Sequence, residues 1–110
     1  MAVRRGDIVI VAIPGDFGKP RPALIIQSDI FNDDPASIAL CPLTTELLEL
    51  PVFRIAVAPT EANGLRAQSQ VMIDKVATVR PQRLRETIGS LDDQTLRRVD
   101  GALAVFLGLA

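Results

Sequence analysis

The chain is organised as a series of short apolar runs separated by breaks rich in proline and glycine, and this pattern limits the folds open to it. Five runs have the length and the β-branched composition of strands. They are Asp7–Ile13, Ala23–Ser28, Ser37–Leu43, Pro51–Pro59 and Ser69–Val79. No long helical pattern separates them, and parallel strands need a long crossover connection. The pattern therefore predicts a mostly antiparallel sheet.

The last segment carries the clearest helical signal in the chain. Between Ser90 and Ala110 its apolar side chains recur at helical spacing, at Leu96, Val99, Leu103 and Phe106. We expect Ser90 to cap this helix and Gly108 to end it. A shorter segment, Thr44–Leu50, predicts one or two helical turns. Together the elements predict a mainly β (α+β) protein, a barrel-like antiparallel sheet with a helix packed on it, as a single domain over residues 1–110.

The composition argues against several classes of function. The 110-residue chain has no histidine, so it lacks the commonest acid–base residue and the commonest metal ligand. Its net charge of −1 argues against duplex DNA binding through bulk charge. Cys41 is the one cysteine and cannot form an internal disulfide, which suits a reducing compartment. With no signal peptide or membrane-length apolar run, we expect a cytoplasmic protein.

The stretch "GKPRP" fixes a cation at the start of a buried run. Pro20 and Pro22 each set their own φ and push the preceding residue toward extended backbone, so Arg21 has little freedom. A guanidinium held in this way can meet a phosphate at low entropic cost. Lys19 adds a second positive charge. The alternative is a rigid loop whose charges are simply solvated.

Two further residues have both a chemical and a structural interpretation. Thr44 follows the third run, where its hydroxyl can project from a strand end or cap the short helix. Asp74 is the one acid in the long fifth run, where alternation places it opposite Lys75. A partly buried carboxylate needs a partner. Asp74 is therefore either the partner of an arginine or a poised general base.

The charged residues are segregated along the chain although the total is near neutral. Between Asp29 and Glu49 the charged residues are all acidic. Basic residues predominate in the following part, at Arg54, Arg66, Lys75, Arg80, Arg83 and Arg85. A groove lined by this basic part can hold a single strand of nucleic acid. An ordinary solvated surface is the alternative.

Several stretches, in this order, resemble the MazF/PemK family of toxins from type II toxin–antitoxin systems. They are "RGDIV", "KPRPALIIQSD", "CPLTTE", "SQVMIDKVATV", "RLRETIGSLDD" and "VDGALAVFLGL". The resemblance implies an SH3-like antiparallel barrel of about five to seven strands with a C-terminal helix, in a homodimer. It implies sequence-specific cleavage of single-stranded RNA without metal or cofactor, leaving 2′,3′-cyclic phosphate and 5′-hydroxyl ends. It also implies a cognate antitoxin as partner.

The family's site residues carry over to matching positions. Its arginine before proline falls on Arg21, its threonine after the third strand on Thr44, and an acid catalytic in some members on Asp74. PemK-type members have an arginine two residues before that acid, where this chain has Met72, so the general acid has no assigned residue. The expected RNA-binding residues are Lys19, Ser69, Gln70, Lys75 and Arg80.

Two other functions stay open at this level. The chain also resembles the gyrase poison CcdB in "IIQSDI", "PLTTELLELPV" and "FLGLA". Poisoning of that kind depends on a C-terminal tryptophan, and Leu107 occupies its position here. A non-catalytic binding module is the third possibility, because small barrels of this kind often only bind.

Overall fold

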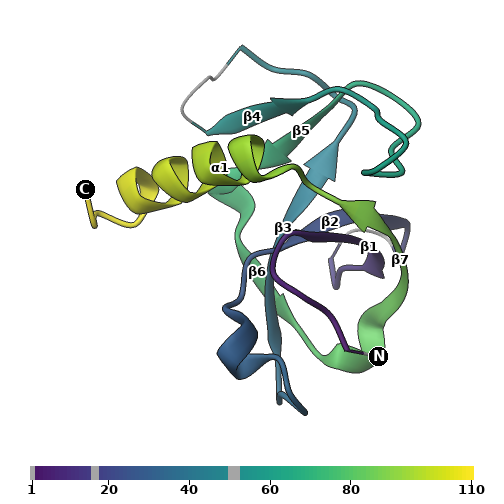
Figure 1. Ribbon diagram of the computed structural model, residues 1–110. Coiled ribbons are helices and arrows are strands. Elements are labelled where there is room, and N and C mark those ends of the chain that lie inside the picture. The colour runs from purple at the N-terminus through teal and green to yellow at the C-terminus, as the bar shows by residue number, and fades with distance from the viewer. Residues whose placement is uncertain (1, 16–17, 50–52) are drawn as a thin grey trace.

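The computed structural model describes residues 2–15, 18–49 and 53–110, and within them the chain forms an antiparallel sheet with one long C-terminal helix (Figure 1). The hydrogen-bonded strand order is β4-β5-β3-β2-β1-β7, with β6 also paired to β3. The elements are β1 (Asp7–Ala12), β2 (Pro20–Ile25), η1 (Asp29–Phe31), β3 (Ile38–Thr44), β4 (Arg54–Val57), β5 (Ser69–Met72), η2 (Ile73–Lys75), β6 (Ala77–Val79), η3 (Pro81–Arg83), β7 (Leu84–Ser90) and α1 (Asp93–Phe106). The predicted mainly β architecture is confirmed. The sheet is barrel-like but open, because β4 and β7 lie at the two ends of the strand order.

The fifth predicted strand is in fact three elements, because β3 exchanges one neighbour for another. The first half of β3 pairs with β6, for example Leu40 with Ala77, and its end pairs with β5, for example Leu43 with Val71. The 3-10 turn η2 joins these two pairings. Asp74 and Lys75 therefore lie on a turn, and the prediction that they occupy opposite faces of one strand is wrong.

Strand β2 begins earlier than predicted, and both of its prolines lie inside it. Ile26, directly after β2, donates its N–H to the carbonyl of Ala39 in β3 (3.1 Å). The backbone N and C=O groups of the even-numbered residues of β2 therefore point toward β3. Pairing with β3 begins only at Ala23, which leaves the nitrogens of Pro20 and Pro22 on an edge that β3 does not cover. Proline is tolerated there because no ladder hydrogen bond is lost.

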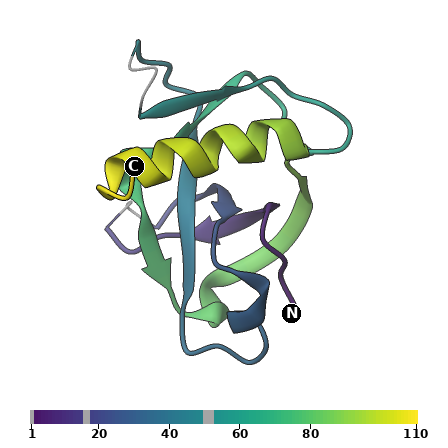
Figure 2. The same ribbon diagram turned by 60° about the vertical axis from the view of Figure 1, so that its left-hand side comes forward.

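The sheet is buried on both faces, which explains why its strands are apolar without alternation. Ile8, Leu24 and Cys41 belong to the core beneath α1, together with Val99 and Leu103 of the helix. Alternate residues of the same strands fill a second core on the other face, including Val9, Val11, Ala23, Ile25, Ile38 and Leu40. The helix runs across the sheet beside β4 and η2 (Figure 2).

The ends of α1 differ in part from the prediction. Ser90 closes β7, and the helix is capped by Asp92, whose carboxylate accepts hydrogen bonds from the Thr95 N–H (3.0 Å) and hydroxyl (2.9 Å). The Thr95 N–H, and then its hydroxyl, hold the pKa of Asp92 below its usual value. Gly108 adopts φ +75° just beyond the last turn, as expected of a helix stop. Among the described residues, no helix combines the length and apolarity needed to span a membrane.

Candidate functional site

Arg21 stands between two neighbouring hollows on the molecular surface. The first, which we call the apolar pocket, has a volume of about 360 Å³. Its walls include Ile13, Pro42, Met72 and Ala77, with Lys75 and Arg21 at its rim. The second, the hydroxyl pocket, measures about 220 Å³ and is also lined by Arg21. Arg21, whose backbone the flanking prolines restrict, therefore borders both hollows.

The hydroxyl pocket collects residues that lie far apart in the sequence. Thr44 ends β3 and Thr45 begins the loop after it, while Ser69 starts β5 and Lys19 lies in the segment before β2. The pairing of β3 with β5 places Thr44 opposite Gln70 and so beside Ser69. The structure thus brings Lys19, Arg21, Thr44 and Ser69, four of the predicted site residues, to the lining of one hollow.

The two buried or half-buried hydroxyls in this pocket have different hydrogen bonds. Thr44 Oγ1 accepts the N–H of Glu46 (3.0 Å), which uses an oxygen lone pair and not the hydroxyl proton. Ser69 Oγ donates to the carbonyl of Ala67 (2.9 Å), so what it can offer a ligand is an acceptor. Thr44 starts a tight turn here, and the alternative that it caps a helix is wrong.

A third hollow of about 340 Å³ continues from the hydroxyl pocket, with which it shares Pro22, Thr45 and Ser69. Its far wall includes Arg66 and Glu86. We call the three hollows together the groove. Its cations are Lys19, Arg21, Lys75 and Arg66, and among the described residues Glu86 is the one acidic side chain in its lining. Cations along a groove suit the backbone of a single nucleic-acid strand.

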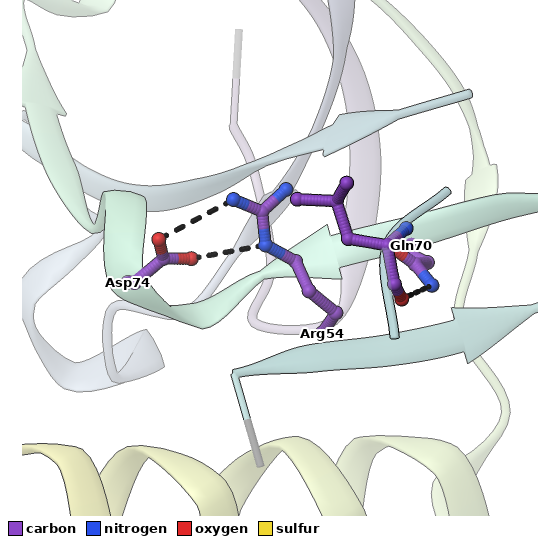
Figure 3. Close-up of polar contacts among 4 residues, drawn as sticks. Arg54, Gln70 and Asp74 are labelled. Carbon is purple, nitrogen blue, oxygen red and sulfur yellow. Dashed lines mark hydrogen bonds and ion pairs between the residues drawn. The ribbon is translucent and has the colours of Figure 1, made fainter. Parts of the chain in front are cut away.

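Gln70, expected to bind RNA, instead fastens the loop that follows β3 (Figure 3). Its side-chain oxygen accepts the N–H of Leu48 (3.0 Å), and its nitrogen donates to the carbonyl of Leu48 (2.8 Å). This pair of bonds resembles the pairing of two strands and fixes the loop to β5. Residues 45–49 contain bends and no helical turn, so the helical turns predicted there are wrong. Leu50 lies outside the described residues.

Asp74 forms an ion pair with Arg54, the arginine partner that one sequence interpretation required (Figure 3). Arg54 Nε lies 3.2 Å from Oδ1, and its Nη2 donates to Oδ2 at 3.3 Å. The Arg54 side chain is only 8% exposed and that of Asp74 28%. Asp74 does not line the three hollows of the groove. Arg54 was not among the residues predicted for the site, although an arginine inside the apolar run "FRIAV" is a signal of a buried ion pair.

Arg80 lies apart from the other predicted RNA-binding residues. It follows β6, whose last residue, Val79, pairs with Ile38 at the start of β3. Thr44 is at the other end of β3, roughly 20 Å away at about 3.3 Å per strand residue. The structure therefore gathers Lys19, Ser69 and Lys75 around Arg21, and leaves Arg80 outside that group.

Cys41 is the one thiol and lies in the core beneath α1. Burial, and then the nearby Asp74 carboxylate, raise the pKa of this thiol to about 12. A thiol of this kind is protonated at neutral pH and inert as a nucleophile. Cys41 therefore supplies no nucleophile to the groove.

Known proteins share both the sequence and the fold. Residues 4–107 match the family described as PemK-like, MazF-like toxin of type II toxin–antitoxin system. The chain is 48% identical to a probable endoribonuclease MazF of Mycolicibacterium smegmatis (98% of this chain, 99% of the relative) and 27% identical to endoribonuclease EndoA of Bacillus subtilis (99% and 97%). A solved mycobacterial endoribonuclease in complex with its cognate antitoxin superposes with a TM-score of 0.83 at 25% identity (99% and 98%). This chain belongs to the family of PemK-like, MazF-like toxins of type II toxin–antitoxin systems.

Proposed function

We propose that the chain is an endoribonuclease toxin that cleaves single-stranded RNA at specific sequences, without a metal ion or cofactor, leaving 2′,3′-cyclic phosphate and 5′-hydroxyl ends. The observation that carries this proposal is the position of Arg21, fixed between two hollows and beside Thr44 and Lys19. The relatives named as endoribonucleases support it. Cleavage of mRNA in this way stops translation and growth.

The reaction needs stabilisation of charge more than a nucleophile from the protein. The ribose 2′-hydroxyl loses its proton to water as its oxygen attacks the adjacent phosphorus, and the bond to the 5′-oxygen of the next nucleotide breaks as that oxygen takes a proton from water. Negative charge rises on the non-bridging oxygens, where a fixed guanidinium acts most strongly. Arg21 suits this role because its backbone is held in β2. Because a guanidinium keeps its proton in proteins, arginine stabilises charge better than it supplies a proton.

The neighbouring side chains have complementary roles in this mechanism. The Thr44 hydroxyl donates its proton to a non-bridging oxygen, while its lone pair remains bonded to the Glu46 N–H. Lys19 and Lys75 lie on either side of Arg21 and neutralise the flanking phosphates. For Asp74 we propose a structural role, as the ion-pair partner of Arg54, in place of the general base that the resemblance implied.

A cleavage assay in EDTA tests the proposal. Purified protein is incubated with a defined single-stranded RNA, and the product ends are analysed by mass spectrometry. We expect fragments with 2′,3′-cyclic phosphate and 5′-hydroxyl termini, and about 10²–10³-fold slower cleavage by Arg21→Ala prepared in parallel. Intact RNA together with trapped gyrase–DNA complexes in a topoisomerase assay would instead identify a CcdB-like poison. If the protein shows neither activity, the remaining interpretation is a non-catalytic binding module.

We further propose a homodimer, a cognate antitoxin as partner and a cytoplasmic location. Apolar side chains lie exposed where β4 begins and α1 ends, and Phe53 packs edge-to-face on Phe106 with ring centroids 5.7 Å apart. Exposed apolar surface of this kind is typical of protein–protein contacts. Its members are Phe53, Val105, Phe106, Leu107 and Leu109. Light scattering of the toxin, alone and with its antitoxin, measures both assemblies.

A further inference from the structure

The two pockets that meet at Arg21 have different chemistry. In the apolar pocket the polar side chains are those of Arg21 and Lys75, both of which only donate hydrogen bonds. In the hydroxyl pocket Thr45 and Ser69 add acceptor oxygens. In the first pocket the polar side chains offer a base only donors. In the second pocket the Thr45 hydroxyl can donate and accept, and the Ser69 hydroxyl, whose proton is bonded to Ala67, can accept.

Met72 is a long, unbranched apolar side chain in the lining of the first pocket. It is 7% exposed, and its neighbour Val71 is buried in the core beneath α1, so alternation along β5 directs Met72 to the opposite face. Met72 and Pro42 line one wall of the pocket. An unbranched thioether packs well against flat rings.

Thr45 is the matching residue of the second pocket. It is exposed, it lines both the hydroxyl pocket and the third hollow, and it follows Thr44 directly. The clamp between Gln70 and Leu48 holds the loop that begins with Thr45. Its hydroxyl is therefore presented to the groove from a fixed loop.

We propose that Met72 and Thr45 select the bases on opposite sides of the cleaved bond. This inference rests on the proposed function, because it requires the scissile phosphate to lie over Arg21. A phosphate held there sends its two flanking nucleotides in opposite directions, one into each pocket. At about 360 and 220 Å³, the pockets lie near or below the lower end of the usual range for small-molecule sites, about 300–1,000 Å³. Each suits a single base rather than a longer segment.

The test compares cleavage-site preferences across a pool of random-sequence RNA, with the 5′-hydroxyl ends captured and sequenced. Met72→Gln keeps the side-chain length but adds a donor and an acceptor, and we expect it to change the preferred base on one side of the cut by about tenfold or more. Met72→Leu is its control and should keep the wild-type preference. Thr45→Val removes the hydroxyl from an exposed position and should change the preference on the other side only.

Each outcome decides the matter. Changes on opposite sides of the cut support the assignment. Changes on the same side, or unchanged preferences in variants that still cleave, overturn it. If thermal melting shows that Met72→Gln does not fold, Ile13→Thr tests the same pocket from another segment. Absence of cleavage by the wild-type protein would instead refute the proposed nuclease function, which keeps the two failures distinct.

Discussion

Replacing Asp74 by asparagine distinguishes an ion-pair partner from a general base. The substitution keeps the shape of the side chain but leaves the Arg54 guanidinium, 8% exposed, without its counter-charge. Loss of one member costs about 3–5 kcal/mol in a fully buried pair and up to about 1 kcal/mol at the surface. Because Asp74 is 28% exposed, we expect a loss of about 2 kcal/mol in the free energy of unfolding.

That loss corresponds to a measurable shift in melting temperature. Unfolding entropies of about 2.1 cal/mol/K per residue, applied to the 110 residues of the chain, convert 2 kcal/mol into a decrease of about 9 °C. Arg54→Met is the matched variant, because it keeps most of the side-chain length and removes the charge. In the double variant neither charge is left unpaired. Its loss of free energy of unfolding should therefore be smaller than the sum of the losses in the two single variants.

The assay pairs circular-dichroism melting with kcat and KM for a defined RNA at a temperature well below both transitions. We expect Asp74→Asn to lower the melting temperature and keep kcat within about threefold of wild type, with the same pH dependence. General-base catalysis contributes about 10²–10⁴-fold. A fall of that size in kcat at an unchanged melting temperature would refute the ion-pair assignment and restore Asp74 as the base.

Three further predictions concern the groove and the core. Arg21→Ala should lower kcat by about 10²–10³-fold with little change in melting temperature. Arg21→Lys should recover only part of the lost kcat. Wild-type turnover in the alanine variant would remove Arg21 from the mechanism. Thr44→Val should lower kcat by about tenfold with KM nearly unchanged, as read from initial rates, and an equal kcat would leave Thr44 a purely structural role. The Cys41 thiol should not react with Ellman's reagent in the folded protein at pH 8. Because its folded pKa is raised from 9.0 to about 12, the stability that its protonation contributes is complete below pH 9 and lost as pH rises toward 12, which denaturant titrations at several pH values measure. Fast reaction of Cys41 with Ellman's reagent in the native protein would contradict the burial of its thiol.

The sequence predicted those elements whose cause is local. β1, β3 and α1 follow from apolar runs and helical spacing within single segments, and the structure confirms them. The segment Ser69–Val79 was different, because nothing in its apolar run marks the turn η2. That break arises where β3 passes from β6 to β5, and such a change of neighbour is a tertiary event.

The candidate site divides in the same way. Arg21 was predictable because the two prolines that fix it are its neighbours in sequence. The partner of Asp74 was not, since Arg54 reaches it from another strand. The helix predicted over Thr44–Leu50 failed for a related reason: a side chain from β5, Gln70, hydrogen-bonds the backbone of Leu48 and outweighs the local helical preference.

Pro20 and Pro22 also decide how another chain can approach the groove. An exposed sheet edge normally invites a further strand, which adds by main-chain hydrogen bonding. The edge of β2 beside Arg21 presents two imide nitrogens where such a strand would need N–H donors. A protein segment that covers Arg21 must therefore bind through its side chains, and the same feature keeps this edge from pairing with other copies of the toxin.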